Sequence, residues 1–600
     1  RTTMKRRRNV LGLAVAGAAA LCLPAYVIHI LAGGGGGGGD YEDDEEMMER
    51  EEEEIRMHRL LQTLDDPTPP DDESLFSVPD WLSSVEHVED EAVIDASLHL
   101  ALDEAVSSRK ASAASRLESL PSYDILDAIR SSNLFEATYA IVVYDNLEDE
   151  FLFLYTRNMR WLQGANAKLR IVLVNFVYLL RRTFPDRFCG KECDELAIGV
   201  NSGDYPHLHS ECLTPSNCIE YKDTPTLQFG SVFRNPAILP NMIAMPMPIS
   251  NGLKCFVIFG GSDKSQVCTG LKSPDEMMNN ERRMSKTTEG RLVYGEEATP
   301  DVWEGLIPQV VWRGTNFLYV GHLNNLRMPS ILSDLHSVAF SKIEDPMERK
   351  AAATQALRKS YDRLLPRWKG VVWTAEAELE VQEKKRDDAD ENYGDAQSSL
   401  PWANIKFMAH MDKYKKLASD YGIPAMGEHL SLADLSRYRY HLDIGGGGGT
   451  TWSGTVQKLA LPGLLFHHVT PTKDYVHDRM VPWVHHVPVR EDLTDLRDRF
   501  DWAEAHPAAA RSIARKGTEL MRRIGTVEGF GEMYEEVFVE PLRRVVEAYE
   551  PVSATHPGMT WRDVIKSNSD DLPGMYVREK CQGNHSGKVG CEFLGEAAIE

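Results

Sequence analysis

A run of five glycines follows an apolar, strand-like stretch in HLDIGGGGGTTWSGTVQKLALPG, residues 441–463. Glycine-rich turns between a strand and a helix let a ligand approach the backbone, and their N–H groups can bind phosphate. The spacing fits neither the G-x-G-x-x-G dinucleotide fingerprint nor a P-loop. The stretch therefore predicts a generic phosphate-binding junction, with Thr451 or Ser453 capping the next helix and Lys458 adding a point charge. A low-complexity turn is the alternative, because residues 33–39 form another glycine run.

A carboxylate follows a second apolar stretch, AIGVNSGDYPHL, residues 197–208. Asp204 comes after an expected strand, and open α/β sheets bind ligands at the carboxyl ends of their strands. Asp-Tyr-Pro is also a common turn, so the stretch alone leaves both interpretations open. His207 and His209 have the i, i+2 spacing of a zinc-ligating pair on a strand, but the sequence offers no third ligand. Contact with an acceptor, or simple surface exposure, is the alternative for these histidines.

The N-terminal region places an apolar run between a basic cluster and an acidic one. Lys5–Arg8 precede residues 10–32, which carry no formal charge and are long enough to cross a bilayer core of about 30 Å. We expect an uncleaved signal anchor with its N-terminus in the cytoplasm, and a cleaved signal peptide is the alternative. Residues 40–54 hold eleven acids and one Arg. They indicate a solvated, self-repelling spacer, which we expect to be part of a glycine-rich and acidic stem.

The net charge of −25, from 66 basic and 91 acidic residues, argues against a nucleic-acid partner, because no basic stripe occurs beyond the N-terminus.

Eight cysteines follow the apolar run: Cys189, Cys193, Cys212, Cys218, Cys255, Cys268, Cys581 and Cys591. Their even number and local spacing predict disulfides in an oxidising compartment, whereas a zinc site would be expected to show a CxxC pair. Asn584 begins a glycosylation sequon. We expect a single-pass type II protein of the Golgi or ER membrane with a luminal body.

Short apolar runs alternate with helix-like stretches through the body of the chain, which predicts a parallel α/β architecture. A division near residue 305 predicts a pair of Rossmann-like domains. The expected organisation is a cytoplasmic tail (1–9), a transmembrane anchor (10–32), a stem (33–130), an N-terminal acceptor domain that carries the catalytic base (131–305), a C-terminal nucleotide-sugar domain (306–550) and a tail with a cysteine pair (551–600).

Several stretches, taken together and in order, resemble the CAP10-type glycosyltransferases of family 90, which include protein O-glucosyltransferases and capsule xylosyltransferases. These stretches are VNSGDYP, VVWRGTNF, SLADLSRYRYHLDIGG, WSGTVQKLALPGLLFHH and DYVHDRMVPWVHHVPVREDLTDL. The resemblance covers roughly residues 195–545. It implies a GT-B fold, in which two Rossmann-like domains face a cleft, the C-terminal one holding a UDP-sugar and the N-terminal one the acceptor.

The resemblance also assigns roles to residues. It implies that Asp204 is the catalytic base, with Tyr205 and His207 on the acceptor side. The donor-binding positions that it implies are Arg313, Gly314, Thr315, Asp443, Gly449, Thr451, Trp452, Ser453 and Lys458. Family members often carry an Arg where this sequence has Gly454. Lys458 is the expected substitute, although an ammonium cannot reproduce a bidentate guanidinium contact.

The implied activity is an inverting transfer of glucose or xylose from UDP to a hydroxyl of a protein or glycan, without a metal or other cofactor. The missing Arg favours one alternative, an inactive relative that binds glycans or acts as a membrane-anchored scaffold. A glycosidase would need a second carboxylate at the site. Asp388-Ala-Asp390 matches the metal-binding Asp-x-Asp of another glycosyltransferase class. It lies in a charged segment with no preceding strand, so we expect a solvated loop there.

Overall fold

The computed structural model divides into two compact units, each described here by itself. Unit 1 comprises residues 1–65, 124–202 and 551–600, and unit 2 comprises residues 66–123 and 203–550. The described residues are 73–117, 122–123, 139–155, 176–177, 180–181, 183–201, 224–228, 230–234, 242–245, 253–257, 266–271, 298–316, 342–388, 400–408, 415–451, 453–524, 527–563, 576–583 and 589–593. Residues 203–305 are grouped with unit 2, and the expected domain boundary after residue 305 stays a prediction.

Across the residues described, no helix combines the length and the apolar character that a membrane span requires. The predicted anchor at residues 10–32 and the cytoplasmic tail at residues 1–9 lie outside the described residues.

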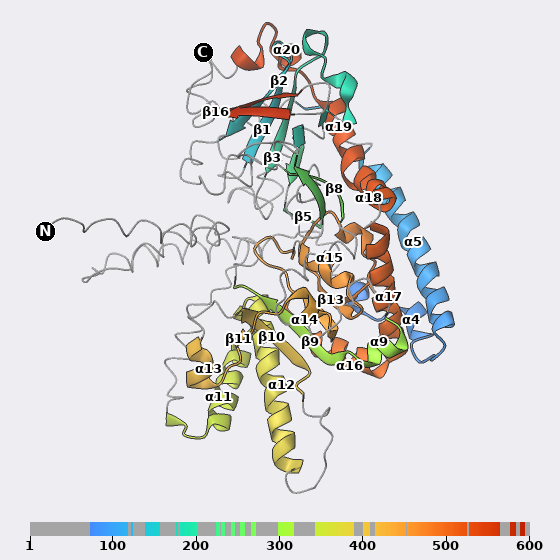
Figure 1. Ribbon diagram of the computed structural model, residues 1–600, viewed down its shortest axis with the longest axis vertical. Helices are drawn as coiled ribbons and strands as arrows, with labels where there is room; N and C mark the ends of the chain where they lie inside the picture. The colour runs from blue at the N-terminus through green and yellow to red at the C-terminus, as the bar shows by residue number, and fades with distance from the viewer. Residues whose placement is uncertain are drawn as a thin grey trace, which may run out of the picture. The chain divides into compact units, whose positions relative to one another are not determined.

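Six parallel strands form the central sheet of unit 2 (Figure 1). The strands lie in the order β11-β10-β9-β12-β13-β15, and every neighbouring pair runs parallel. Counted along the chain, this order is 3-2-1-4-5-6, which is the Rossmann arrangement and agrees with the expected C-terminal domain. The strands are β9 (Ile307–Gly314), β10 (Ala403–Met408), β11 (Met426–Gly427), β12 (Tyr438–Asp443), β13 (Leu464–His468) and β15 (Val487–Val489).

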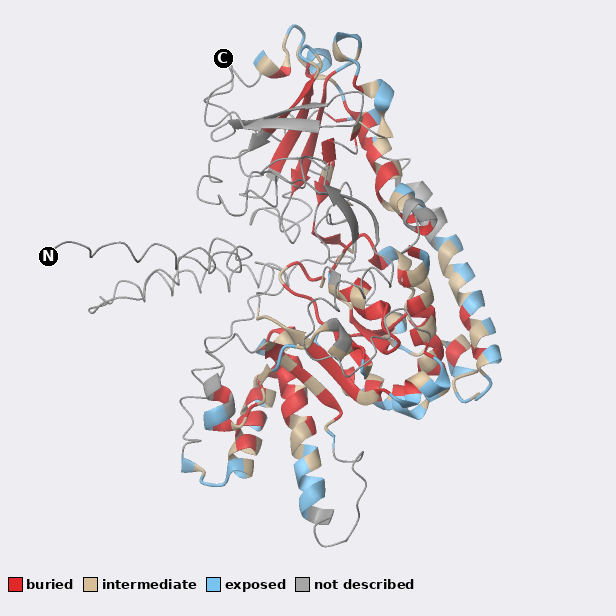
Figure 2. Ribbon diagram, in the orientation of Figure 1, coloured by how far each residue is buried: buried red, intermediate tan, exposed pale blue. Residues whose placement is uncertain are grey.

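Helices connect these strands and cover the sheet, whose central strands are largely buried (Figure 2). Buried parallel strands need nearly unbroken apolar sequences, and Val310, Val311, Leu442 and Phe466 provide them. The first half of α12 is buried and its last turns are exposed, so only its N-terminal part packs on the sheet. The connecting and covering helices are α9 (Pro300–Glu304), α11 (Pro346–Lys359), α12 (Pro366–Asp388), α13 (Lys415–Tyr421), α14 (Leu432–Leu435), α15 (Ser453–Leu459), α16 (Leu496–Ala505), α17 (Pro507–Ile524), α18 (Val527–Tyr534) and α19 (Glu540–Ala548).

Part of the predicted stem is folded into unit 2. Residues 73–117 form α3 (Glu73–Phe76), α4 (Asp80–Ser83) and the long α5 (Glu91–Leu117), which lies beside α17 (Figure 1). In α5, Glu91 pairs with Arg511 and Arg515 of α17. Buried apolar positions within the acidic sequence join the same core: Leu82, Ile94 and Leu98. The solvated acidic spacer expected at residues 40–54 lies outside the described residues.

Short strand pairs complete unit 2. β4 (Thr226–Gln228) and β6 (Met242–Ala244) are parallel, and β5 (Val232–Phe233) pairs antiparallel with β14 (Thr472–Lys473). A hairpin joins β7 (Leu253–Val257) to β8 (Gln266–Leu271).

The described strands of unit 1 are antiparallel, which differs from the parallel arrangement expected of a Rossmann-like domain. Their order is β17-β16-β2-β1-β3. Residues 146–149 alone join β1 to β2, and so short a connection allows only antiparallel pairing. The strands are β1 (Tyr139–Asp145), β2 (Glu150–Tyr155), β3 (Leu196–Asn201), β16 (Tyr576–Gly583) and β17 (Val589–Phe593), and α20 (Val552–Thr555) accompanies them.

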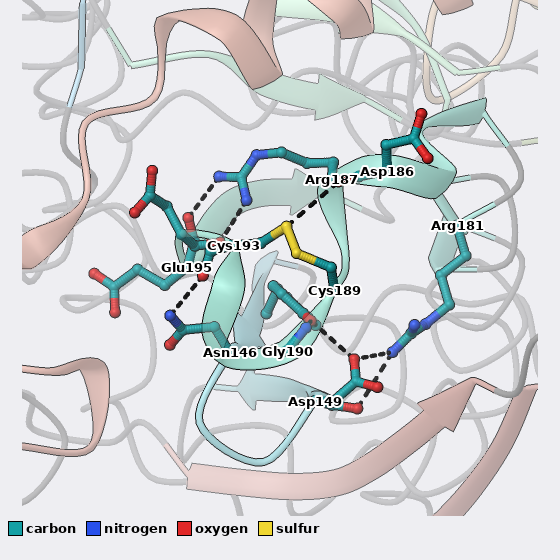
Figure 3. Close-up of a disulfide and its surroundings, with 11 residues drawn as sticks. Asn146, Asp149, Arg181, Asp186, Arg187, Cys189, Gly190, Cys193 and Glu195 are labelled. Atoms are coloured by element: carbon teal, nitrogen blue, oxygen red, sulfur yellow. Dashed lines mark hydrogen bonds and ion pairs between the residues drawn. A yellow bond between two sulfur atoms is a disulfide. The ribbon is translucent and has the colours of Figure 1, made fainter.

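A disulfide between Cys189 and Cys193 closes a short loop before β3 (Figure 3). Asn146 donates its side-chain N–H to the Cys193 carbonyl at 2.7 Å, which ties the loop to the β1–β2 turn. Arg187 donates to the Glu195 carbonyl at 2.8 Å and so anchors the other side. The Cys189–Cys193 disulfide confirms the predicted pairing of cysteines that are close in the sequence.

Backbone register predicts two further disulfides. Cys581 lies directly opposite Cys591 in the β16–β17 pair, and Cys255 lies directly opposite Cys268 in the β7–β8 hairpin. Opposed residues of antiparallel strands have Cα atoms about 4.5–5.5 Å apart, within the range that a disulfide spans. Non-reducing peptide mapping by mass spectrometry should recover both cross-linked peptides. Recovery of either cysteine in a different linkage, or as a free thiol, would contradict the register.

Candidate functional site

The carboxyl ends of β9 and β12 mark the candidate site. These strands are neighbours at the centre of the parallel sheet, and the strand order reverses between them. Ligands of open α/β sheets bind in the crevice at such a topological switch point. Residues 314–316 lie at the end of β9, and residues 444–451, which contain the glycine run, directly follow β12.

Asp443, the last residue of β12, is a buried carboxylate in a network of hydrogen bonds. Its Oδ2 accepts from the Thr455 hydroxyl at 2.6 Å and lies 3.0 Å from His467 Nδ1. Burial alone would raise the pKa of Asp443, but the hydrogen bond from His467 and the charge of Lys458 outweigh it. Together they hold the pKa of Asp443 well below its usual range. Asp443 is therefore an anion that positions α15 and β13.

Lys458 supplies the matching cation from the last turn of α15. Its Nζ lies 4.0 Å from Asp443 Oδ1, and an ideal Cβ at Gly454 would lie 3.6 Å from the same Nζ. The ammonium therefore lies beside the position where relatives of the resembled family carry an arginine. Burial lowers the pKa of Lys458, while Asp443 opposes that shift.

The glycine run is a closed turn that is mostly buried. Its N–H groups at Gly445, Gly446 and Gly449 donate to His468 Nδ1, to the Thr450 carbonyl and to the Gly446 carbonyl. The glycines are required by protein packing: Gly449 has φ +77°, and a Cβ on Gly446 would lie 2.6 Å from an arginine Nη2. These three N–H groups, expected to receive a phosphate, are thus used within the protein.

That arginine is Arg367, which the sequence analysis missed. It lies in the first turn of α12 and bridges the two strand ends, because Nη1 donates to the Thr315 carbonyl at 2.6 Å and Nη2 to the Ile444 carbonyl at 3.3 Å. Its guanidinium carbon lies 5.2 Å from the centre of the Trp312 ring. Burial lowers the pKa of Arg367 to about 10, so it stays cationic at neutral pH. The only sequence signal was its place after Pro366, at a helix start.

Arg313, predicted to contact the donor, is directed to the other side of β9. Its guanidinium donates to the Asn404 carbonyl at 2.7 Å, to Asn404 Oδ1 at 3.0 Å and to the Glu428 carbonyl at 3.1 Å. Those partners belong to β10 and to the loop after β11, away from β12. Through these contacts, Arg313 links β9 to β10 and to the loop after β11. At Gly314, an added Cβ would meet the Trp312 ring at 2.4 Å, which explains the glycine there.

A segment expected in the acceptor domain contacts the glycine run and its neighbourhood within unit 2. Ser231 donates to the Gly448 carbonyl at 2.7 Å, and Thr472 donates to the same oxygen at 2.6 Å. Arg234 donates from Nε to the Thr470 carbonyl at 2.8 Å. The β5–β14 pairing holds this segment in place, so Arg234 brings a third cation to the neighbourhood of the run.

A group of buried histidines lies behind Asp443. The His467 ring centre is 4.8 Å from that of His477 and 5.0 Å from that of His486. Burial lowers the pKa of each of these rings, so they are neutral at physiological pH. His477 Nδ1 accepts from the Asp474 N–H at 2.8 Å, and burial raises the pKa of the Asp474 carboxyl to about 7. The histidines thus pack around the carboxylate without adding charge.

Several predicted site residues cannot be placed. Asp204, Tyr205, His207, Trp452 and Asn584 lie outside the described residues. Ser453 begins α15, and Thr451 lies 2.7 Å, oxygen to oxygen, from the Thr455 hydroxyl that binds Asp443. The structure thus brings Thr315, Asp443, Gly449, Thr451 and Lys458 to one edge of the sheet.

Residues 403–528 match glycosyl transferase family 90. The matched range includes Asp443, the glycine run and Lys458, and it excludes Asp204, Arg313 and Arg367.

Curated proteins show the same similarity over limited spans. The chain is 26% identical over 160 residues to protein O-glucosyltransferase 2 of Danio rerio, which is 26% of this chain and 29% of that protein. It is 27% identical over 110 residues to protein O-glucosyltransferase 1 of Homo sapiens, which is 18% of this chain and 27% of that protein. A further match, 27% over 100 residues, is to protein O-glucosyltransferase 3 of Homo sapiens, covering 16% of this chain and 18% of that protein. The chain therefore spans less than a third of the length of each relative.

The buried charge pair predicts a stability difference. Asp443→Asn should lower the free energy of unfolding by about 3 kcal/mol, because it leaves the buried Lys458 ammonium without its counter-ion. Adding Lys458→Met should restore part of that loss, since the unpaired cation is then gone. Chemical denaturation of both single variants and the double variant measures the coupling. Strictly additive losses would show that the two side chains do not interact.

Proposed function

We propose that this chain transfers a sugar from a UDP-sugar to a hydroxyl group, because residues 403–528 match glycosyl transferase family 90. The observation that carries the proposal is the switch point of a 3-2-1-4-5-6 parallel sheet, with Arg367 and Lys458 at the strand ends beside it. Rossmann-like sheets bind nucleotides at that place, and a diphosphate requires positive charge there.

The charges around the crevice suit a leaving diphosphate. Arg367 and Lys458 are held by Ile444 and Asp443 respectively, so they need little reorganisation when negative charge develops. Lys458 beside Gly454 and Arg367 beside Gly446 together supply cations near the position of the missing family arginine. We propose that this pair takes the role of that arginine.

The proposed reaction is a single displacement. The acceptor oxygen attacks the anomeric carbon, the bond from that carbon to the UDP oxygen breaks, and UDP leaves with the electron pair. The acceptor proton passes to the carboxylate of Asp204, which we propose as the base, and the anomeric configuration inverts. A positioned general base contributes roughly 10²–10⁴-fold to such a step.

The named relatives are protein O-glucosyltransferases, so we propose a protein or glycan hydroxyl as acceptor and glucose or xylose as the sugar. The disulfide at Cys189–Cys193 supports an oxidising compartment, which we propose is the lumen of the Golgi or ER. Anchoring through residues 10–32 and a GT-B arrangement of two domains remain parts of this proposal.

UDP release by the purified full-length protein, measured against a panel of UDP-sugars with candidate acceptor proteins and glycans, tests this function. Release with one donor should fall at least ~100-fold in Asp204→Asn, because the base is lost. Asp194→Asn is the matched control, since Asp194 is exposed in a turn, and its release should equal that of the wild type.

UDP-sugar binding without release with any acceptor would favour the inactive alternative, in which the crevice holds a nucleotide sugar but the chain acts as a scaffold. Failure of every UDP-sugar to bind, measured by calorimetry, would contradict the crevice assignment itself.

Arg367→Lys should raise the KM for the UDP-sugar about tenfold, because a single ammonium cannot hold both the Thr315 and Ile444 carbonyls. The glycine run then loses its fixed position beside β9. Arg363→Lys, an exposed change four residues earlier, should leave KM unchanged. Steady-state kinetics of both variants measures the effect. Equal KM values for Arg367→Lys and Arg363→Lys would show that Arg367 does not contribute to donor binding.

A further inference from the structure

We infer that Glu86, His87 and His506 form a binding site for a divalent zinc-type cation, separate from the sugar-transfer site. Glu86 and His87 lie in the turn between α4 and α5, and His506 ends α16 just before α17. One ligand atom from each residue lies within 4.8 Å of the other two. Both segments belong to unit 2.

The distances are close to those of a coordination sphere. Glu86 Oε1 lies 3.8 Å from His87 Nε2 and 3.9 Å from His506 Nε2, and the two ring centres are 4.9 Å apart. Ligand atoms about 2.0–2.1 Å from a tetrahedral zinc lie roughly 3.3 Å from one another. The His87 side chain is 77% exposed, so its ring can rotate to close this gap.

Hydrogen bonds already orient two of the three ligands. His506 Nδ1 lies 2.8 Å from the Trp502 carbonyl, and because a carbonyl only accepts, Nδ1 carries the proton. The lone pair is therefore on Nε2, the atom that faces Glu86. Trp502 Nε1 donates at 2.8 Å to Glu86 Oε2, which leaves Oε1 for the metal. Such outer contacts fix ligand tautomer and direction in metal sites.

The ligand set selects the cation. Two imidazoles and one carboxylate suit Zn²⁺ and the neighbouring transition metals, whereas Mg²⁺ and Ca²⁺ require oxygen ligands. Three protein ligands leave the fourth tetrahedral position to water.

The cation would join two segments that are distant in the sequence. The α3–α5 region already contacts the C-terminal part of unit 2. Trp483, in the loop before β15, donates from Nε1 to the Leu75 carbonyl at 3.0 Å, and Arg511 of α17 pairs with Glu91. A metal at the α4–α5 turn adds a coordinate link between the same elements. Its role is structural, because none of its three ligands belongs to the crevice at β9 and β12.

A metal-free contact between Glu86 and the two histidines is the competing explanation for the cluster. It predicts that Zn²⁺ binding does not depend on His87, whereas the metal site predicts that His87→Ala loses one bound Zn²⁺. Titration of both proteins with Zn²⁺ therefore distinguishes the two explanations.

Calorimetric titration of Zn²⁺ into the metal-stripped full-length protein at pH 7.5 tests the site. The wild type should bind one more Zn²⁺ than His87→Ala, and Trp502→Phe should weaken that site by roughly 10–100-fold, because the N–H that orients Glu86 is lost. His99→Ala, an exposed histidine of α5, is the matched control and should bind as the wild type does. The wild type and His87→Ala should show the same binding of Mg²⁺.

Thermal unfolding gives a second measurement on the same proteins. Zn²⁺ should raise the midpoint of the wild type and of His99→Ala more than that of His87→Ala, by mass action on the folded state. Equal Zn²⁺ stoichiometry and affinity in the wild type and His87→Ala at pH 7.5 would overturn the proposal.

Discussion

The buried carboxylate of Asp443 is the interaction on which the described site depends. An unpaired anion at this depth would be costly, and the surrounding residues are those that compensate it: a hydroxyl from Thr455, an imidazole N–H from His467 and the ammonium of Lys458. These partners come from α15 and β13, the two elements that follow the glycine run. The contacts that compensate the charge of Asp443 therefore also fix the positions of α15 and β13.

Positive charge is arranged around this anion on a fixed frame. Arg367 joins the strand ends of β9 and β12 through two carbonyls, and Arg234 is held by the Thr470 carbonyl. The neutral histidines behind Asp443 fill the space without adding charge. The strand ends of β9 and β12 thus carry positive charge that does not rely on flexible surface side chains, and fixed donors stabilise developing charge better than mobile ones.

Local pattern predicted the parallel sheet and the strand–glycine–helix junction well, because buried parallel strands and glycine turns have strong sequence signatures. It gave no information where a residue's partner is distant in the chain. The sequence did not indicate that Arg313 binds Asn404 on the neighbouring strand, and its contact with a donor stays a prediction. Arg367 was missed, since nothing near Pro366 in sequence indicates that Ile444 lies beside it. Nor did the sequence of α5 indicate that Glu91 pairs with the arginines of α17.

Unit 1 has a consequence for how the protein is made. Its sheet combines β1, β2 and β3 with β16 and β17, strands from opposite parts of the sequence. During synthesis β2, with the sequence EFLFLY, emerges long before the strand that pairs with its outer edge. Until β16 leaves the ribosome, that apolar edge is open to pairing with other chains. Completion of this sheet is therefore a late event in the folding of the chain.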